Sequence, residues 1–178
     1  DSIYQIAEQV NFETDKMYNN RRGDITLLIN GLPLIHIELK ASGVEVEQAT
    51  NQIQKYVKEG VFTGLFNMVQ VFFAITPEDS LYFANYGKWE NANPAFYFHW
   101  MTKDNKPIKD WRQLCKGPSQ ILSIPEAHKL IGYYVVADKG KNVLKVLRSY
   151  QYYAINAIFN RVREHDWNTY SPLGGYIW

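Results

Sequence analysis

The residues with the clearest chemical potential in this sequence are two acids and a lysine near its start. Asp24 is followed by Glu38 and then, two positions later, by Lys40. Two neighbouring carboxylates attract a hard divalent cation such as Mg²⁺, which prefers oxygen ligands. The cation can polarise a phosphate and acidify a water, and an ammonium group can offset charge in the transition state. The pattern therefore suits metal-dependent phosphodiester hydrolysis, with Asp24 and Glu38 as metal ligands. A solvated polar strand face remains the alternative reading of the same spacing.

A hairpin must bring these groups together. Residues 24–29 (DITLLI) and 34–40 (LIHIELK) alternate between apolar and polar positions and are rich in β-branched residues, which is typical of strands. Asn30 and Gly31 stand between them, and this pair favours a tight hairpin because both residues tolerate positive φ.

The register of this hairpin decides which side chains meet. A strict two-residue turn pairs Asp24 with Ile37 and places the carboxyl on the apolar face. One additional residue pairs Asp24 with Glu38 instead and gathers the apolar side chains on one face. We therefore predict a three-residue or bulged turn. The polar face would carry Asp24, Thr26, His36, Glu38 and Lys40.

A helix is expected directly after the hairpin. Residues 44–59 have helical spacing and contain neither Pro nor Gly, and Gly60 is a plausible stop. Gln52 and Tyr56 lie four positions apart on one face of this helix. An amide and a phenol there could hydrogen-bond the DNA backbone or orient Lys40, although an isolated pair of this kind is more often a surface pair. His36 could touch the outer shell of the metal, but a neutral surface histidine is expected.

The remaining pattern predicts an α/β fold, with helices packed on a mixed sheet. Further strands are expected over residues 68–76, 81–86 and 95–100, and helices over residues 125–137 and 144–165.

Composition limits the alternatives. The net charge of +1 gives no general basic field, so any nucleic-acid function must depend on a local site. A single cysteine, Cys115, excludes an internal disulfide and is compatible with a reducing, cytosolic compartment. We expect no membrane partner and no signal peptide. The first residue is not Met, and the last residues are apolar, which suggests a fragment of a longer chain.

The stretch RRGDITLLINGLPLIHIELK, followed by NQIQKY, resembles the nuclease domain of the restriction (R) subunit of type I restriction-modification enzymes. The resemblance continues in LYFAN at residues 81–85, between Trp100 and Trp111, and in the last third of the chain. It implies a PD-(D/E)xK nuclease core of the branch that adds a QxxxY element. By resemblance, Asp24 and Glu38 hold Mg²⁺, Lys40 is catalytic, and Gln52 and Tyr56 support DNA binding. Related nucleases often have another acid on an N-terminal helix, for which Glu8 and Glu13 are candidates.

The resemblance also implies a domain order and partners. Residues 1–120 would form the endonuclease domain, and residues 121–178 a helical connector and the start of a superfamily 2 helicase motor. The substrate would be double-stranded DNA, and the partners would be the methylation and specificity subunits of a bacterial or archaeal complex. Within 147–158, Gln151 resembles the adenine-recognising residue of helicases, supported by Arg148. In the family, residues 174–178 (GGYIW) lead into a phosphate-binding loop that this sequence lacks, so ATP would be bound by the longer subunit.

Two other functions remain open. The chain could be a non-catalytic docking module of a DNA motor, or an exonuclease domain of a repair helicase. The basic stretch 103–116 could follow phosphates or could be a solvated connector. Trp100 and Trp111 could stack on bases, but packing is expected for both.

Overall fold

A five-stranded mixed sheet forms the centre of the molecule. The computed structural model describes residues 1–13, 20–117, 120–166 and 168. The strand order is β1-β2-β3-β4-β5, in which β3 and β4 are parallel and the other neighbours are antiparallel. The strands are β1 (Tyr4–Phe12), β2 (Arg21–Ile29), β3 (Leu32–Leu39), β4 (Val71–Ile75) and β5 (Ser80–Ala84). The expected α/β class with a mixed sheet is confirmed.

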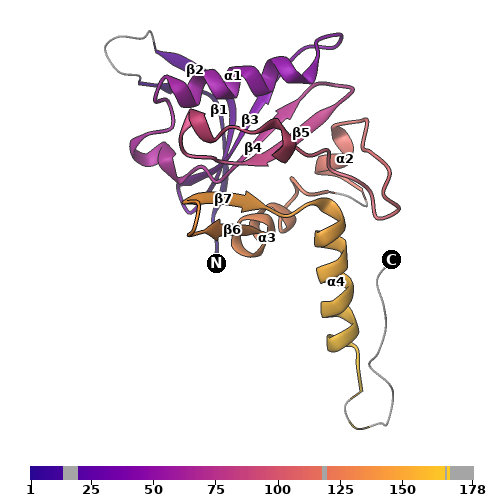
Figure 1. Cartoon of the computed structure of the whole chain (residues 1–178). Coiled ribbons are helices and arrows are strands. Elements are labelled where there is room, and N and C mark those ends of the chain that lie inside the picture. The colour runs from indigo at the N-terminus through magenta and orange to yellow at the C-terminus, as the bar shows by residue number, and fades with distance from the viewer. Residues whose placement is uncertain (14–19, 118–119, 167, 169–178) are drawn as a thin grey trace.

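Helix α1 (Val46–Lys58) forms the crossover that allows β3 and β4 to run in parallel. It packs on β3, β4 and β5 and covers one face of the sheet (Figure 1). Gly60 follows the helix with a φ of 73°, so the predicted stop is confirmed. The core on this side is strongly aromatic and includes Phe12, Ile53, Phe62, Phe72 and Phe83.

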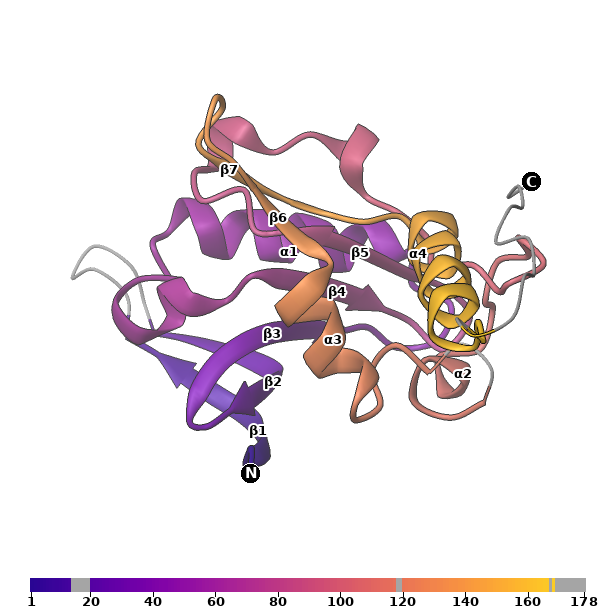
Figure 2. The same ribbon diagram turned by 90° about the horizontal axis from the view of Figure 1, so that it is seen from below.

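The opposite face is covered by later segments of the chain. Helix α3 (Glu126–Tyr133) and the hairpin of β6 (Val135–Asp138) and β7 (Val143–Val146) lie across this side of the sheet (Figure 2). Their side chains share one core with β3 and β4, namely Ile35, Ile37, Phe73, Leu130 and Val146. This core contains residues from both sides of position 120, so the two parts of the chain pack as one unit. The expected functional division at residue 120 stays a prediction.

The connecting segments are short and irregular. They contain the 3₁₀ turns η1 (Gly64–Met68), η2 (Trp89–Asn91) and η3 (Pro94–Phe96) and the short helix α2 (Arg112–Cys115). Helix α4 (Ser149–Arg163) projects from the rest of the molecule (Figure 1). Among the described residues, none of the helices combines the length and apolar character needed to cross a bilayer.

Several expected elements are corrected by the structure. Residues 95–100 do not form a strand, because η3 occupies their start and only a single bridge joins Phe98 to Tyr82. The helices expected over 125–137 and 144–165 are shorter. Residues 135–138 and 143–146 form a hairpin whose turn is stabilised by Asp138 Oδ1, which accepts hydrogen bonds from the backbone N–H groups of Gly140 and Lys141.

The first strand, β1, was not expected at all. Residues 4–12 pair along β2 and form one edge of the sheet. Glu8 therefore lies on a strand rather than on an N-terminal helix, and Glu13 is exposed just beyond its end.

Candidate active site

The hairpin of β2 and β3 has the predicted pairing, but it reaches this pairing by a different route. Asn30 and Gly31 form a two-residue turn with φ angles of 53° and 79°, and Ile29 pairs with Leu32. The register then shifts between Leu27 and Leu28, so that Leu27 pairs with Ile35 and Ile25 with Ile37. The extra residue is therefore accommodated by a bulge within the strand and not by a longer turn. The bulge is confirmed, and a three-residue turn is wrong.

Asp24 occupies an irregular point of β2. Gly23 faces the α1 side of the sheet, because a Cβ there would lie 2.5 Å from Phe12 and 2.6 Å from His36. Ile25, two positions further, packs against the core on the opposite side of the sheet. On β1, Gln9 has a φ of 51° and lies between the residues that pair with Gly23 and Ile25. The strand kinks here and directs Asp24 toward the end of β3, where its Oδ2 accepts a hydrogen bond of 2.7 Å from the backbone N–H of Leu39.

The carboxyl of Asp24 is held in a partly desolvated position. Burial raises the pKa of Asp24 above its usual range; the hydrogen bond from Leu39 opposes this rise, and the nearby charge of Glu38 adds to it. Lys40 counteracts the effect of Glu38 on this pKa. The two acids are therefore close enough to influence each other, which is the arrangement that favours a shared cation.

Glu38 is buried, with 1% of its side chain exposed. Its Oε1 accepts a hydrogen bond of 2.9 Å from Lys40 Nζ. Its other oxygen, Oε2, is buried and has no hydrogen-bond partner among the described residues. Oε2 lies 3.5 Å from Nε2 of His36, within ion-pair range but outside hydrogen-bond geometry. His36 is itself 0% exposed, so the expected surface histidine is wrong.

Lys40 is connected to helix α1 by a chain of hydrogen bonds. Its Nζ donates to Oε1 of Gln52 at 2.6 Å, and Nε2 of Gln52 donates to the Tyr56 hydroxyl at 2.6 Å. The Tyr56 hydroxyl donates in turn to the backbone carbonyl of Arg22 at 3.0 Å. Burial raises the pKa of Tyr56. The structure thus brings together all five residues that were predicted to share a site, although their roles stay predictions.

The donor set fits a hard divalent cation. Two carboxylates meet beside an ammonium group. One buried carboxylate oxygen has no hydrogen-bond partner in the part of the chain that the structure describes, which is costly unless another group satisfies it. No group of three or more His, Cys, Asp or Glu side chains within residues 1–13, 20–117, 120–166 and 168 could hold a metal ion. Neither Glu8 nor Glu13 therefore completes such a group with Asp24 and Glu38.

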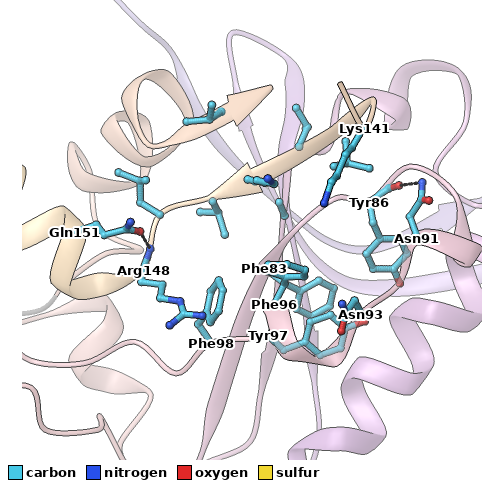
Figure 3. A pocket seen from close by; sticks show the side chains of 17 residues that line it. Phe83, Tyr86, Asn91, Asn93, Phe96, Tyr97, Phe98, Lys141, Arg148 and Gln151 are labelled. Atoms are coloured by element: carbon cyan, nitrogen blue, oxygen red, sulfur yellow. Dashed lines mark hydrogen bonds between the residues drawn. The ribbon is translucent and has the colours of Figure 1, made fainter. Parts of the chain in front are cut away.

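Gln151 and Arg148 lie in a different place, at the start of α4. Both line a cavity of about 680 Å³ between β7 and the segment around η3 (Figure 3). Oε1 of Gln151 accepts a 2.9 Å hydrogen bond from the backbone N–H of Arg148. The Arg148 guanidinium lies 4.6 Å from the centre of the Phe98 ring. The amide oxygen expected to contact adenine is thus already engaged. Residues 174–178 lie outside the described residues.

The structure also places the two tryptophans and the basic stretch 103–116 that were considered as nucleic-acid contacts. Trp100 is 1% exposed and belongs to the core, as expected. Trp111 is 44% exposed and is not part of this core, and the packing of Trp111 against another domain stays a prediction. Within the stretch 103–116, Arg112 forms an ion pair of 2.9 Å with Asp110.

Comparison with known proteins identifies a matching family. Residues 1–91 match the family described as type I restriction enzyme R protein N terminus. The chain is 30% identical over 178 residues to the endonuclease subunit of type I restriction enzyme SauCOLORF180P of Staphylococcus aureus (strain COL), which covers 98% of this chain. It is 34% identical over 164 residues, or 89% of this chain, to the endonuclease subunit of type I restriction enzyme EcoprrI of Escherichia coli. An archaeal relative, the putative type I restriction enzyme MjaVIIP endonuclease subunit of Methanocaldococcus jannaschii, is 33% identical over 161 residues, or 82% of this chain. The chain spans 17%, 49% and 14% of the lengths of these three relatives.

Proposed function

The chain belongs to the family of type I restriction enzyme R protein N-terminal regions, and from this premise we propose that it is a Mg²⁺-dependent endonuclease domain acting on double-stranded DNA. The observation that carries the proposal is the convergence of Asp24, Glu38 and Lys40 at the open end of the β2–β3 hairpin. The proposed fold is the PD-(D/E)xK core with a QxxxY element, supported by Gln52 and Tyr56 on α1.

Each residue has a role that its position supports. Asp24 and Glu38 would hold Mg²⁺, and the bound metal would supply Lewis-acid polarisation of the phosphate and a more acidic water. Lys40 carries its ammonium beside Glu38, where it can orient the attacking water or stabilise charge on the phosphate. Gln52 fixes the direction of Lys40 through a hydrogen bond. Tyr56 anchors Gln52 to the backbone of β2.

The setting of this domain is also a proposal. The relatives are endonuclease subunits much longer than this chain. We propose that residues 1–120 carry the nuclease and residues 121–178 lead to a superfamily 2 motor in the longer subunit, which hydrolyses ATP. The subunit would act with methylation and specificity subunits in bacterial or archaeal cytoplasm, and cutting would follow ATP-driven translocation.

The decisive experiment uses the assembled restriction complex. Asp24→Ala, Glu38→Ala and Lys40→Ala should each lower DNA cleavage by at least about 100-fold, because each removes a group that stabilises the transition state. ATP hydrolysis should remain at the level of the unchanged complex. Glu45→Ala, which alters an exposed acid just before α1, is the matched control and should cut normally. Normal cleavage by the Glu38 variant would reject the assignment.

The two competing functions predict other outcomes. A docking module would show no binding of Mn²⁺ by calorimetry in the unchanged subunit. A repair exonuclease would degrade linear DNA from its ends without partner subunits. The endonuclease should cut closed circular DNA only in the full complex with ATP.

The cavity beside Gln151 favours a second, nucleotide-binding role. The cavity is lined by aromatic rings, by amide side chains and by the basic side chains of Lys141, Lys145 and Arg148. Rings and cations of this kind suit a nucleobase with its phosphates. We propose that Gln151 contacts the adenine of ATP held by the longer subunit. Because its Oε1 accepts from Arg148, its Nε2 would donate to the adenine. Gln151→Ala should weaken binding of a fluorescent ATP analogue, and unchanged binding would remove this role.

A further inference from the structure

A buried polar cluster lies behind the candidate active site, on the side of the sheet that α1 covers. Thr26 and His36 are paired across β2 and β3, and Glu38 follows His36 on the same face of β3. Their exposed fractions are 1%, 0% and 1%. The Thr26 hydroxyl, both His36 ring nitrogens and Glu38 Oε2 are all buried without a hydrogen-bond partner among the described residues. Native interiors seldom leave several such atoms together, so the cluster calls for an explanation.

The ring of His36 is held tightly in place. Phe12, Tyr56, Phe62 and Phe72 contact it edge-on, with ring centroids between 5.3 and 6.4 Å away. Gly23 leaves no room behind it, because a Cβ at that position would lie 2.6 Å from His36 Cε1. An apolar side chain of similar size would suit this aromatic environment better than an imidazole does. Packing alone therefore does not account for a histidine at position 36.

The polar contact of the ring points to its role. Nε2 of His36 lies 3.5 Å from Oε2 of Glu38, while Oε1 of the same carboxylate faces Lys40 at 2.9 Å. The carboxylate is thus flanked by the lysine on one oxygen and the imidazole on the other. With its hydrogen on Nε2, the ring presents a donor to the oxygen that otherwise has none.

We propose that His36 is a positioning residue for Glu38. The Nε2–H group of His36 would hold Oε2 of Glu38 and thereby orient Oε1 toward Lys40 and the bound metal. This inference rests on the proposed function of Glu38 as a metal ligand. Groups that orient a ligand from behind commonly change metal affinity or activity by about 10–100-fold when they are removed.

Two variants separate this role from packing. His36→Gln and His36→Met have side chains of nearly equal length and shape, and both lose the aromatic contacts, but only the glutamine keeps an N–H donor near the position of Nε2. We expect the affinity of the full subunit for Mn²⁺, measured by calorimetry, to fall by about 10-fold or more in His36→Met and to be largely restored in His36→Gln. Equal losses in the two variants would overturn the proposal.

The same measurements distinguish the failure of this inference from the failure of the function. Glu38→Gln should abolish Mn²⁺ binding at this site; if it does not, the metal-binding proposal fails. If Glu38→Gln loses binding while His36→Met retains it, only the role of His36 fails.

The position of the ring proton of His36 can also be measured in the unchanged protein. The sequence has four histidines, so the ring nitrogens of His36 can be assigned by ¹⁵N NMR through comparison with the His36→Gln spectrum. The proposal expects a proton on Nε2 of His36. A ring protonated only on Nδ1 would overturn it.

Discussion

At the scale of single residues, the candidate site depends on a glycine that has no chemistry of its own. Gly23 allows Phe12 and His36 to approach the backbone of β2 directly beside Asp24. Gly23→Ala should lower the free energy of unfolding by about 1–3 kcal/mol, because the added methyl overpacks an aromatic core that cannot easily yield. Urea denaturation of the purified protein measures this change.

A matched glycine provides the control. At Gly132 in α3, an added Cβ would approach nothing closer than His128 Cδ2 at 4.0 Å. Gly132→Ala should therefore leave stability unchanged or raise it by about 0.4–1 kcal/mol. If the two alanine variants behaved alike, close packing at Gly23 would not be the cause.

The sequence predicted which residues converge, because alternation of apolar and polar side chains along two strands selects one register. It did not predict the surroundings of His36. That side chain is buried by Phe12, Phe62 and Phe72, which lie on other segments of the chain, and no local pattern reveals such contacts. The positive φ of Gln9, which accompanies the kink at Asp24, is equally invisible in the alternation.

At the scale of elements, helix α1 is connected to the site through Gln52. This side chain bridges Lys40 and Tyr56. Gln52→Ala should slow DNA cleavage by the full complex by about 10–100-fold, because Lys40 loses the group that orients it. ATP hydrolysis and thermal stability should change little, and single-turnover kinetics would measure the effect.

Gln48 offers a control on the same helix. It is an exposed glutamine one turn earlier, and among the described residues no side-chain hydrogen bond joins it to Lys40, Gln52 or Tyr56. Gln48→Ala should cut DNA at the normal rate. A similar loss in both variants would indicate a general disturbance of α1 rather than a local one.

Elements were predicted well where the pattern was long and regular, as in β2, β3 and α1. Strand β1 was missed because it is an edge strand whose residues are largely exposed, so it carries no continuous apolar run. Strand β6 was missed because α3 ends only two residues before it, and four-residue apolar segments fit either a helix or a strand.

At the scale of the whole molecule, residues after 120 belong to the same core as the sheet. Ile121, Leu130, Tyr134 and Val146 are buried against β3 and β4. The Tyr82 hydroxyl on β5 also donates to the Leu147 carbonyl at 2.8 Å. A chain that ends at residue 120 would lose all of these contacts.

We therefore expect a protein of residues 1–120 to lack cooperative unfolding. Burying one Leu, Ile or Val stabilises a protein by roughly 1.5–3 kcal/mol, so losing several removes much of a typical total of about 5–15 kcal/mol. Circular dichroism melting tests this, with residues 1–164 as the control that keeps Ile121, Leu130, Tyr134, Val146 and Leu147. A sharp transition in the shorter protein would show that residues 1–120 fold alone.

The bulge near Leu34 determines which deletions this hairpin can accommodate. Removing one residue between Gly31 and Ile35 would remove the bulge but keep Leu27 opposite Ile35 and Ile25 opposite Ile37, so the acid–lysine face would keep its side of the sheet. Removing two residues would instead pair Leu28 with Ile35 and turn Glu38 and Lys40 to the other face, away from Asp24. A single deletion in this short segment should thus be compatible with DNA cleavage by the full complex, whereas a double deletion should abolish it.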